Sequence, residues 1–327
     1  MTTTMRVLIT GPTGFIGRPL CEKMAQAGWN VRGAVWEQES DAMLPDGVET
    51  VFIKSIGPDT DWKEALQGIE VIIHLAARVH MMKDTATDKL AEYRLINTAG
   101  TERLVKEAIK HSVKRIVYIS TIKVNGEGSE SAYKADDKVC PKDPYGMSKW
   151  EAELILNKAC DEGGIETVII RPPLVYGPGV TANFLSLIRL VKSGLPLPLG
   201  NARNRRSLVF KGNLMDAIIT CATHGNAVGK TFLVSDGNDV STAELIRQIA
   251  RSLKKKDRLF PFPISWLRLA GTLLNRTGMV DRLTTSLTVD ISKIRMDLDW
   301  EPPYSMEQGL AETAAWYLEK YRNGQTA

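Results

Sequence analysis

Strand-like and helix-like segments alternate through the first half of the chain, and this alternation limits the fold more than any other feature. Short β-branched and apolar runs are separated by longer stretches whose apolar residues recur at helical spacing. The expected strands are MRVLIT (5–10), VRGAVW (31–36), VETVFI (48–53), VIIHLAA (71–77), KRIVYIST (114–121) and TVIIRPP (167–173). The expected helices cover 18–28, 61–68, 95–112, 145–164, 241–255 and 305–321. Strands alternating with helices predict an α/β fold with a doubly wound parallel sheet covered on both faces.

The texture of the sequence changes after the sixth expected strand. Prolines and glycines gather in RPPLVYGPG (171–179) and GLPLPLG (194–200), and the strict alternation stops. Such punctuation marks loops and domain limits. We therefore predict a parallel-sheet domain over residues 1–175 and a smaller mixed α/β domain over 176–327, with a ragged boundary. A chain of 327 residues is long enough to form both.

Charge and cysteine content argue against several classes of function. The net charge is +4, so nothing in the whole-chain charge indicates a nucleic-acid partner. The one dense basic run, RSLKKKDR (251–258), lacks the interleaved aromatic residues of a nucleic-acid platform, and we expect a solvated helix end there. The four cysteines are scattered without a C-x-x-C pair. They indicate neither a zinc site nor a disulfide framework, and they agree with a reducing cytoplasm.

No segment is typical of membrane insertion or secretion. MTTTMRVLIT runs into the first strand without a charged-then-apolar signal segment. FPFPISWLRLAGTLLNRTGMV (260–280) comes nearest to a membrane span, but Arg268, Asn275 and Arg276 interrupt it. We expect a packed amphipathic helix in that segment, with a peripheral membrane role as the alternative. A cytoplasmic protein with no membrane span is therefore predicted.

The glycine-rich segment TGPTGFIG (10–17) lies between the first expected strand and the first expected helix. Gly11, Gly14 and Gly17 permit a turn that is too tight for residues with a Cβ. The helix N-terminus that follows presents unpaired N–H groups and the positive end of its dipole to a pyrophosphate. At this place the glycine pattern predicts a dinucleotide site, with a merely structural turn as the alternative.

Two later strand ends carry small or polar residues. VIIHLAA ends in Ala76 and Ala77, which would let a flat ligand lie against the strand. His74 could act as a catalyst or, with His80, as a metal ligand, but neither has a nearby carboxylate or thiol in the sequence. We therefore expect a packed histidine and no metal site. The hydroxyls of IST (119–121) would point over the sheet edge toward the helix that follows.

The segment PYGMSK (144–149) places Tyr145 and Lys149 one turn apart on one face of a helix. A lysine ammonium near a phenol favours the phenolate and lowers its pKa from about 10. Such a tyrosine exchanges a proton with an alcohol or a ketone near neutral pH. By themselves the two residues fit a surface Tyr and Lys at a helix start better, so the assignment depends on the other motifs.

Taken in order, TGxxGxxG, HLAA, the Ser-Thr strand end and YxxxK resemble the extended short-chain dehydrogenase/reductase family. Within that family the chain is similar to the NAD-dependent epimerases, dehydratases and reductases of nucleotide sugars. The segments RPPLVYGPG, NARNRRSLVFKGNLMDAI (201–218) and DISKIRMDLDWEPP (290–303) also have family counterparts, so the resemblance covers almost the whole chain. It implies a Rossmann-type dinucleotide-binding domain followed by a nucleotide-sugar-binding domain.

The resemblance implies a role for each motif residue. Tyr145 would be the general acid/base, Lys149 would lower its pKa and hold the nicotinamide ribose, and Thr121 would hydrogen-bond the reacting oxygen. Asn97 would support the active-site helix. The residues implied in cofactor binding are Gly11, Gly14, Phe15, Ile16, Gly17, Trp36, Ala76, Ala77, Tyr145 and Lys149. Those implied in binding the sugar diphosphate are Arg206 and, more loosely, Arg282, since a planar guanidinium suits a diphosphate.

The end of the second strand departs from the family pattern. NAD-using members have an acidic residue there that bonds the adenosine ribose, whereas this chain has Val35 followed by Trp36. Glu37 and Glu39 would repel a 2′-phosphate, and Arg32 would attract one if it faced that way. The expected cofactor is therefore NAD or NADP, with a slight lean to NAD.

A second departure concerns the reaction. Leu174 stands where sugar 4-epimerases usually have an Asn that holds the diphosphate, and the RPPxVYGPG form looks more like reductase members. Lys123 replaces a small residue that is usual in 4-epimerases. It would either reach a phosphate or acetamido oxygen of the substrate or lie exposed at the surface.

Together these features predict an NAD(P)-dependent oxidoreductase that acts at carbon 4 of a UDP-hexose. The first expectation is a 4-reductase of UDP-4-keto-6-deoxy-N-acetylhexosamine in surface-polysaccharide synthesis. The alternative is a UDP-glucose or UDP-N-acetylglucosamine 4-epimerase with tightly bound NAD. A remote alternative is a non-catalytic dinucleotide sensor, although such proteins typically lose the Tyr or the Lys. The resemblance also implies a homodimer through the helices over 95–112 and 145–160.

Overall fold

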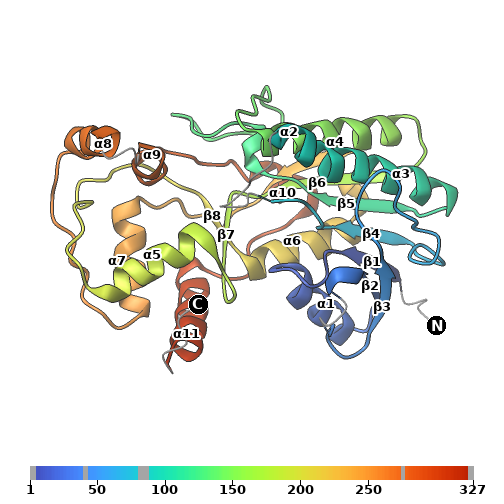
Figure 1. Cartoon of the computed structure of the whole chain (residues 1–327), viewed down its shortest axis with the longest axis horizontal. Coiled ribbons are helices and arrows are strands. Elements are labelled where there is room, and N and C mark those ends of the chain that lie inside the picture. The colour runs from blue at the N-terminus through green and yellow to red at the C-terminus, as the bar shows by residue number, and fades with distance from the viewer. Residues whose placement is uncertain (1–4, 40–42, 80–87, 274–276, 323–327) are drawn as a thin grey trace.

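The computed structural model describes residues 5–39, 43–79, 88–273 and 277–322. Seven strands form the central sheet in the order β3-β2-β1-β4-β5-β6-β9 (Figure 1). They are β1 (Arg6–Thr10), β2 (Asn30–Trp36), β3 (Val48–Ile53), β4 (Val71–His74), β5 (Arg115–Ile119), β6 (Glu166–Arg171) and β9 (Lys230–Leu233). Every neighbouring pair in this sheet is parallel. The predicted Rossmann-type doubly wound sheet is confirmed, with its strand order reversing between β1 and β4.

Helices cover both faces of this sheet (Figure 1). The helices are α1 (Gly17–Gln26), α2 (Lys89–Tyr93), a π-helix (Arg94–Ala99), α3 (Gly100–Lys110), α4 (Pro144–Asp161), α5 (Ala182–Ser193), α6 (Lys211–Thr223), α7 (Thr242–Ser252), α8 (Ile264–Leu273), α9 (Thr277–Thr284), α10 (Ser292–Leu298) and α11 (Met306–Lys320). Val7 and Ile9 of β1 pack with residues of α1 and α6, whereas Leu8 packs with residues of α3 and α4. Successive side chains of a strand point to opposite faces, so an apolar strand of this kind requires helices on both sides.

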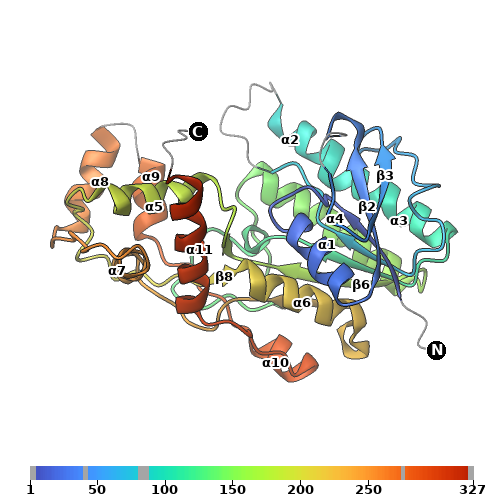
Figure 2. The same cartoon turned by 90° about the horizontal axis from the view of Figure 1, so that it is seen from below.

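A second lobe carries its own apolar cluster. Tyr176 of β7 (Leu174–Tyr176) and Phe210 of β8 (Leu208–Phe210) pack there with residues of α5, α7 and α11. Figure 2 shows these helices gathered at the end of the molecule away from β2 and β3. The chain returns from this lobe to the central sheet through α6 and β9. The predicted division between residues 175 and 176 stays a prediction.

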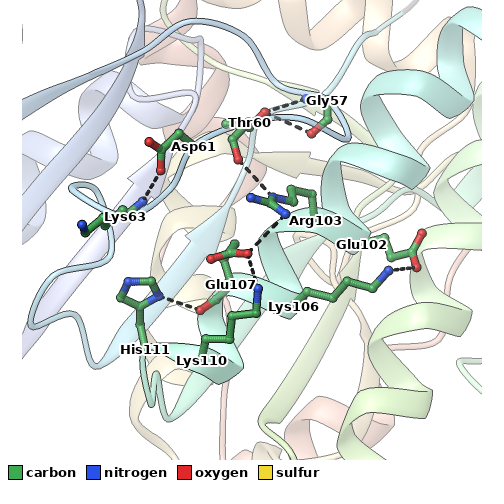
Figure 3. Close-up of polar contacts among 10 residues, drawn as sticks. All are labelled: Gly57, Thr60, Asp61, Lys63, Glu102, Arg103, Lys106, Glu107, Lys110 and His111. Atoms are coloured by element: carbon green, nitrogen blue, oxygen red, sulfur yellow. Dashed lines mark hydrogen bonds and ion pairs between the residues drawn. The ribbon is translucent and has the colours of Figure 1, made fainter.

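The helix expected over 61–68 is wrong, because this segment forms hydrogen-bonded turns instead. The Arg32 guanidinium binds three backbone carbonyls of the segment, those of Glu64, Ala65 and Gln67, at 3.0–3.1 Å. A segment this short recovers little of the cost of helix nucleation, and here its carbonyls have another partner. The residues just before this segment are bonded to α3. Arg103 of α3 donates to the Thr60 carbonyl at 3.1 Å, and this bond holds the 57–63 loop against α3 (Figure 3).

The packed helix expected over 260–280 is also wrong. Two short helices, α8 and α9, lie in this region, and several apolar side chains of α8 face outward. Trp266 is 61% exposed and Leu273 is 78% exposed. Hydrophobic spacing predicted a helix but did not show which face would be covered. In the part of the chain that the structure describes, no helix is both long and apolar enough to cross a membrane.

Candidate active site

The carboxyl ends of the parallel strands bring the predicted motifs to one edge of the sheet. Gly11 directly follows β1, Ala76 lies two residues after β4, and Thr121 lies two residues after β5. Gly11 and Ala76 are in close contact, since a Cβ added at Gly11 would lie 3.1 Å from the Ala76 backbone. α4 begins beside this edge and carries Tyr145 and Lys149. Ligands of doubly wound sheets bind at this edge, where the strand order reverses.

The glycine loop has the geometry that a pyrophosphate site requires. Gly11 has φ +69°, a left-handed conformation that favours glycine, and its carbonyl accepts a hydrogen bond from Gly14 N at 3.2 Å. A Cβ at Gly17 would overlap the Gly11 carbonyl oxygen. The first turn of α1 has neither an acidic residue nor a side-chain cap. Arg18 N already donates to the Gly14 carbonyl at 3.1 Å and Pro19 has no N–H, so among the described residues the Gly17 N–H is the group of this turn that is available to an anion.

Phe15 and Ile16 join this loop to the two lobes. Ile16 packs against the apolar cluster below the central sheet, and Phe15 packs against the cluster of the second lobe. The Lys211 ammonium lies 5.5 Å from the centre of the Phe15 ring. The loop that would hold the dinucleotide is thus anchored to both lobes of the molecule.

The end of β2 presents an indole and a carboxylate. The Trp36 ring nitrogen donates to the Lys54 carbonyl at 2.7 Å, and Glu39 accepts a hydrogen bond from the Thr13 hydroxyl at 2.5 Å. Arg32 does not face this end of the strand. It forms an ion pair with Glu49 at 2.9 Å, besides its bonds to the 61–68 turns. The orientation in which Arg32 would attract a 2′-phosphate is therefore not the one it adopts.

The start of α4 is set by two residues. The Asp143 side chain caps the helix by accepting from Gly146 N at 2.7 Å, and Pro144 occupies the first helical turn. This start places Tyr145 in the first turn and Lys149 one turn further along, as the spacing predicts. Asp143 was not among the residues predicted from the motifs, although an Asp-Pro pair before a helical pattern is a cap signal.

Lys149 is buried without a carboxylate partner among the described residues. Its side chain is 1% exposed, and its ammonium lies 3.9 Å from the centre of the Tyr118 ring. Burial lowers the pKa of Lys149 to about 7. A lysine with this pKa changes its charge near neutral pH.

The predicted lowering of the Tyr145 pKa is wrong for the protein without bound ligand. Burial raises the pKa of Tyr145 above its ordinary value, and the negative charge of Asp143 and the neighbouring Tyr93 raise it further. The Tyr93 and Tyr145 rings lie 5.9 Å apart between centroids. Desolvation is the largest cause for both residues, and it favours the neutral phenol of Tyr145 and the neutral amine of Lys149.

One of the two hydroxyls at the end of β5, that of Ser120, is bonded inside the fold. Ser120 donates to the buried Glu153 carboxylate, which also forms an ion pair with Arg171 at 2.6 Å. Neighbouring residues of an extended strand point to opposite sides, so the bond at Ser120 leaves the open edge to Thr121. The Thr121 backbone is extended, and its hydroxyl accepts from Lys123 N at 3.3 Å.

Lys123 is held by carboxylates. Its ammonium forms an ion pair with Asp143 and lies 3.4 Å from Glu127. Burial alone would lower the pKa of Lys123, but the hydrogen bonds and charges of Asp143 and Glu127 together outweigh burial and raise it. The pair joins the turn after Thr121 to the start of α4. Binding of Lys123 to a substrate stays a prediction.

Asn97 lies in the π-helix and links three segments. Its side-chain amide donates to Ser148 of α4 at 3.0 Å, and its side-chain oxygen accepts from the backbone of Arg78 at 2.8 Å. π-Helical turns are rare and frequently mark functional sites. The implied support of α4 by Asn97 therefore has a direct contact behind it.

Arg206 lies in the second lobe without a carboxylate within 4.0 Å among the described residues. Its guanidinium donates to the carbonyls of Arg282 and Thr285 at 2.7 and 3.3 Å, and burial lowers its pKa. Arg282 is exposed and turns its own guanidinium to the Gly278 carbonyl at 2.8 Å. A partly buried cation without a counter-charge is suited to an anionic ligand.

Backbone pairing connects Arg206 to the segment that follows Thr121. Arg206 forms β-bridges with Val240 and Leu287, and Tyr133 pairs with Val289 two residues further along. The Tyr133 N–H donates to the Thr288 carbonyl at 2.9 Å. The second lobe is thereby joined to the carboxyl edge of the central sheet.

Metal binding finds no support in the described part of the chain. His74 lies there as a packed, buried residue, whereas His80 lies outside the described residues. No three His, Cys, Asp or Glu side chains among those described lie close enough together to hold an ion.

Comparison with known proteins identifies the family of the chain. Residues 7–235 match the model of the NAD dependent epimerase/dehydratase family. A Vibrio cholerae protein named UDP-glucose 4-epimerase is 44% identical over 317 residues, which cover 96% of this chain and 95% of that protein. The N-acetyl-alpha-D-glucosaminyl-diphospho-ditrans,octacis-undecaprenol 4-epimerase of Escherichia coli O157:H7 is 26% identical and covers 94% of this chain and 93% of its own length.

Solved structures share the whole fold. The UDP-glucuronic acid 4-epimerase from Bacillus cereus, solved in complex with NAD, has a TM-score of 0.77 at 23% identity, covering 97% of this chain and 100% of its own. The UDP-glucose 4-epimerase of Thermotoga maritima, solved with UDP-glucose, has a TM-score of 0.76 at 20% identity and covers 97% and 99% of the two chains. At these identities the likeness shows the fold.

Proposed function

Because the chain belongs to the NAD-dependent epimerase/dehydratase family of extended short-chain dehydrogenases/reductases, we propose that it is a UDP-sugar 4-epimerase that retains NAD between its two half-reactions. The observation that carries this choice is the 44% identity to a UDP-glucose 4-epimerase along almost the whole of both chains. The site adds a Tyr145–Lys149 pair at the open edge of the sheet and a partly buried arginine in the second lobe. This choice reverses the order of the two expectations drawn from the sequence.

The residues present fit the dinucleotide. The predicted nicotinamide cofactor is confirmed at the level of the family, which is NAD-dependent. Gly11, Gly14 and Gly17 form a cradle that a Cβ would fill, and the uncapped start of α1 faces it. Ala76 would bound the cradle on the other side, because it lies against Gly11. With Arg32 turned away and Glu39 near the end of β2, the chain favours a free ribose hydroxyl over a 2′-phosphate.

Proton transfer falls to Tyr145. When bound, NAD supplies the hydride acceptor and donor that no side chain can replace. Tyr145 would take the proton of the 4-hydroxyl at its Oη and return it to the 4-oxygen after the sugar has rotated to present its other face. Lys149, with a pKa of about 7, would stabilise the tyrosinate in its charged form. Thr121 would donate its hydroxyl to the same sugar oxygen.

Arg206 is proposed to bind the diphosphate of the UDP-sugar. Its guanidinium has only backbone carbonyls as partners among the described residues, so its charge is available to phosphate oxygens. Arg282 would reach the same group from α9 after leaving its Gly278 carbonyl. The sugar itself would then extend toward Tyr145 at the sheet edge.

A 4-reductase acting on a UDP-4-keto-6-deoxy-N-acetylhexosamine is the second candidate. The observation that favours it is Leu174, which begins β7 as an exposed apolar side chain where a 4-epimerase usually has an Asn. Both reactions would use Tyr145, Lys149 and Thr121 in the same roles. They differ in whether the cofactor leaves after each turnover.

The deciding experiment purifies the protein without added cofactor, denatures it and identifies the released dinucleotide. Near one mole of NAD per mole of chain, with interconversion of UDP-glucose and UDP-galactose or of their N-acetyl forms, is the expected result. An empty protein that oxidises NADH or NADPH with a UDP-4-keto sugar would select the reductase. Tyr145→Phe is the matched control, because it removes only the phenolic proton. If the wild type turned over neither kind of substrate and Tyr145→Phe bound NAD as well as the wild type, both candidates would be refuted and a dinucleotide sensor would remain.

We also propose a cytoplasmic homodimer. Leu95 of the π-helix and Leu154 of α4 are each 48% exposed, on the two segments expected to form a four-helix contact. Exposed leucines on paired helices are typical of an interface between copies. Light scattering should give twice the chain mass, and Leu154→Lys should reduce it to one chain. A wild-type protein that is monomeric at micromolar concentration would refute this assembly.

A further inference from the structure

His74 is hydrogen-bonded on both sides in the middle of the sheet edge. Its Nδ1 lies 2.7 Å from the Thr10 hydroxyl, and its Nε2 lies 3.0 Å from the Thr101 hydroxyl. All three side chains are buried. Thr10 ends β1 next to Gly11, whereas Thr101 lies in the first turn of α3. The imidazole therefore bridges the strand that leads into the glycine loop and the helix segment behind the active site.

The neighbouring bonds determine which nitrogen carries the proton. Thr101 donates its only hydroxyl hydrogen to the Asn97 carbonyl at 2.7 Å, so it can only accept from the imidazole. Nε2 must then carry the hydrogen, and Nδ1 must accept from Thr10. Thr10 in turn accepts from Ala76 N at 3.2 Å. Burial, reinforced by the positive charge of Lys149, lowers the pKa of His74 to about 3 and keeps the ring neutral.

The same chain of bonds reaches the catalytic helix. Asn97, whose carbonyl accepts from Thr101, donates its side-chain amide to the Ser148 hydroxyl at 3.0 Å. Ser148 then donates to the Tyr145 carbonyl at 2.8 Å. In every bond of this path the donor precedes the acceptor. The Ala76 N–H donates to Thr10, Thr10 donates to His74, His74 donates to Thr101, and Thr101 donates to the Asn97 carbonyl. The path of hydrogen bonds thus ends on Ser148 and Tyr145, which lie at the start of α4.

We propose that His74 is a positioning residue that couples the cofactor-binding glycine loop to the Tyr145 helix through its two opposite hydrogen bonds. The inference rests on the proposed function, because the coupling has a purpose only if dinucleotide and proton transfer meet at this edge. The acceptor side, toward Thr10, orients the turn at Gly11 and the Ala76 backbone. The donor side, toward Thr101, orients Asn97 and with it Ser148 and Tyr145. A misplacement of about 1 Å at a reacting group costs on the order of 100-fold in rate.

Two substitutions separate the two sides. In His74→Asn the amide oxygen falls near the position of Nδ1 and can still accept from Thr10, but nothing reaches Thr101. In His74→Gln the amide nitrogen falls near the position of Nε2 and can still donate to Thr101, but the bond to Thr10 is lost. We expect His74→Asn to lower kcat by about 10- to 100-fold with the Kd for NAD within about 3-fold of wild type. We expect His74→Gln to raise the Kd for NAD by about 10-fold with a smaller loss in kcat.

Further variants guard against a failure to fold and against a general packing effect. Thr101→Val should reproduce the loss in kcat, and Thr101→Ser should restore it, because serine keeps the hydroxyl in the chain of bonds. His111→Asn and His111→Gln are matched controls at the C-cap of α3, where the Glu107 carbonyl is the hydrogen-bond partner of the ring among the described residues. Both should leave kcat and the Kd for NAD unchanged.

The ring itself provides a readout that does not depend on activity. Nitrogen-15 NMR of the full chain should show His74 as the neutral Nε2–H tautomer from about pH 5 to pH 8. An Nδ1–H tautomer, or a ring that titrates in this range, would overturn the inference. Equal losses in kcat and NAD affinity in both His74 variants would overturn it too, as plain packing. Retained activity in Tyr145→Phe would instead refute the proposed function and leave the tautomer result intact.

Discussion

Lys149→Met should stabilise the protein at neutral pH while it abolishes activity. Lys149 is buried without a carboxylate partner among the described residues, and its pKa falls from its usual 10.5 to about 7. The unfolded chain therefore binds more protons between these two values, so the stability of the wild type rises as the pH rises through this range. Methionine has a similar length and no charge to bury.

The magnitude follows from the two pKa values. Integrating the linkage relation gives a cost of about 4 to 5 kcal/mol for burying Lys149 near pH 6.5 and about 2 kcal/mol near pH 9. The substitution also loses the contact of the ammonium with the Tyr118 ring, which is worth about 1–2 kcal/mol when desolvated. We expect a net gain of about 3 kcal/mol near pH 6.5. Near pH 9 the folded lysine is neutral and has no ammonium contact to lose, so the expected gain there is about 2 kcal/mol. For a chain of this length 3 kcal/mol corresponds to a rise of about 4 °C in Tm.

The assay is thermal unfolding at both pH values after removal of any bound dinucleotide. Lys158→Met is the matched control on the same helix, because the Lys158 side chain is 77% exposed and should give no pH-dependent gain. A Lys149→Met variant that unfolds at or below the wild-type temperature at both pH values would refute the reasoning. That result would mean that the ammonium has a compensating partner in the folded protein.

Three other predictions address the cofactor loop, the second lobe and the core. Gly17→Ala should abolish the rise in Tm that NAD causes, because the new Cβ overlaps the Gly11 carbonyl oxygen; a normal NAD shift would disprove the cradle. Arg206→Leu should raise the KM for the UDP-sugar at least about 10-fold and leave kcat within about 3-fold, since binding to the diphosphate is remote from the reacting carbon. A loss confined to kcat would exclude that role. Glu153→Gln should cost about 3–5 kcal/mol in urea unfolding, because it leaves the Arg171 charge buried and uncompensated, and a cost below about 1 kcal/mol would contradict this.

Local patterns in the sequence determined most of the framework. Short β-branched and apolar runs, separated by stretches with helical spacing, predicted each strand of the first half to within a few residues. The glycine spacing at 10–17 and the four-residue interval between Tyr145 and Lys149 also placed these groups on their elements. These signals are local, because a strand, a tight turn and a helix face each depend on neighbouring residues in the chain.

Long-range contacts decided what the local patterns left open. Arg32 lies in an ordinary strand, and only the fold shows that it binds the 61–68 turns and is turned away from the cofactor. Ser120 and Thr121 look equivalent in the sequence, yet Glu153, 33 residues further along, takes the first and leaves the second at the edge. The pKa of Tyr145 reverses its expected direction because burial depends on everything packed around the ring.

His74 shows the same division most clearly. Its strand and its burial follow from the apolar run VIIHLAA, and a packed histidine is what that run predicts. Its partners Thr10 and Thr101 lie 64 and 27 residues away in the chain. Hydrogen bonds need their groups within about 3 Å in a defined direction, and only the folded sheet and its covering helices bring these three side chains to that distance.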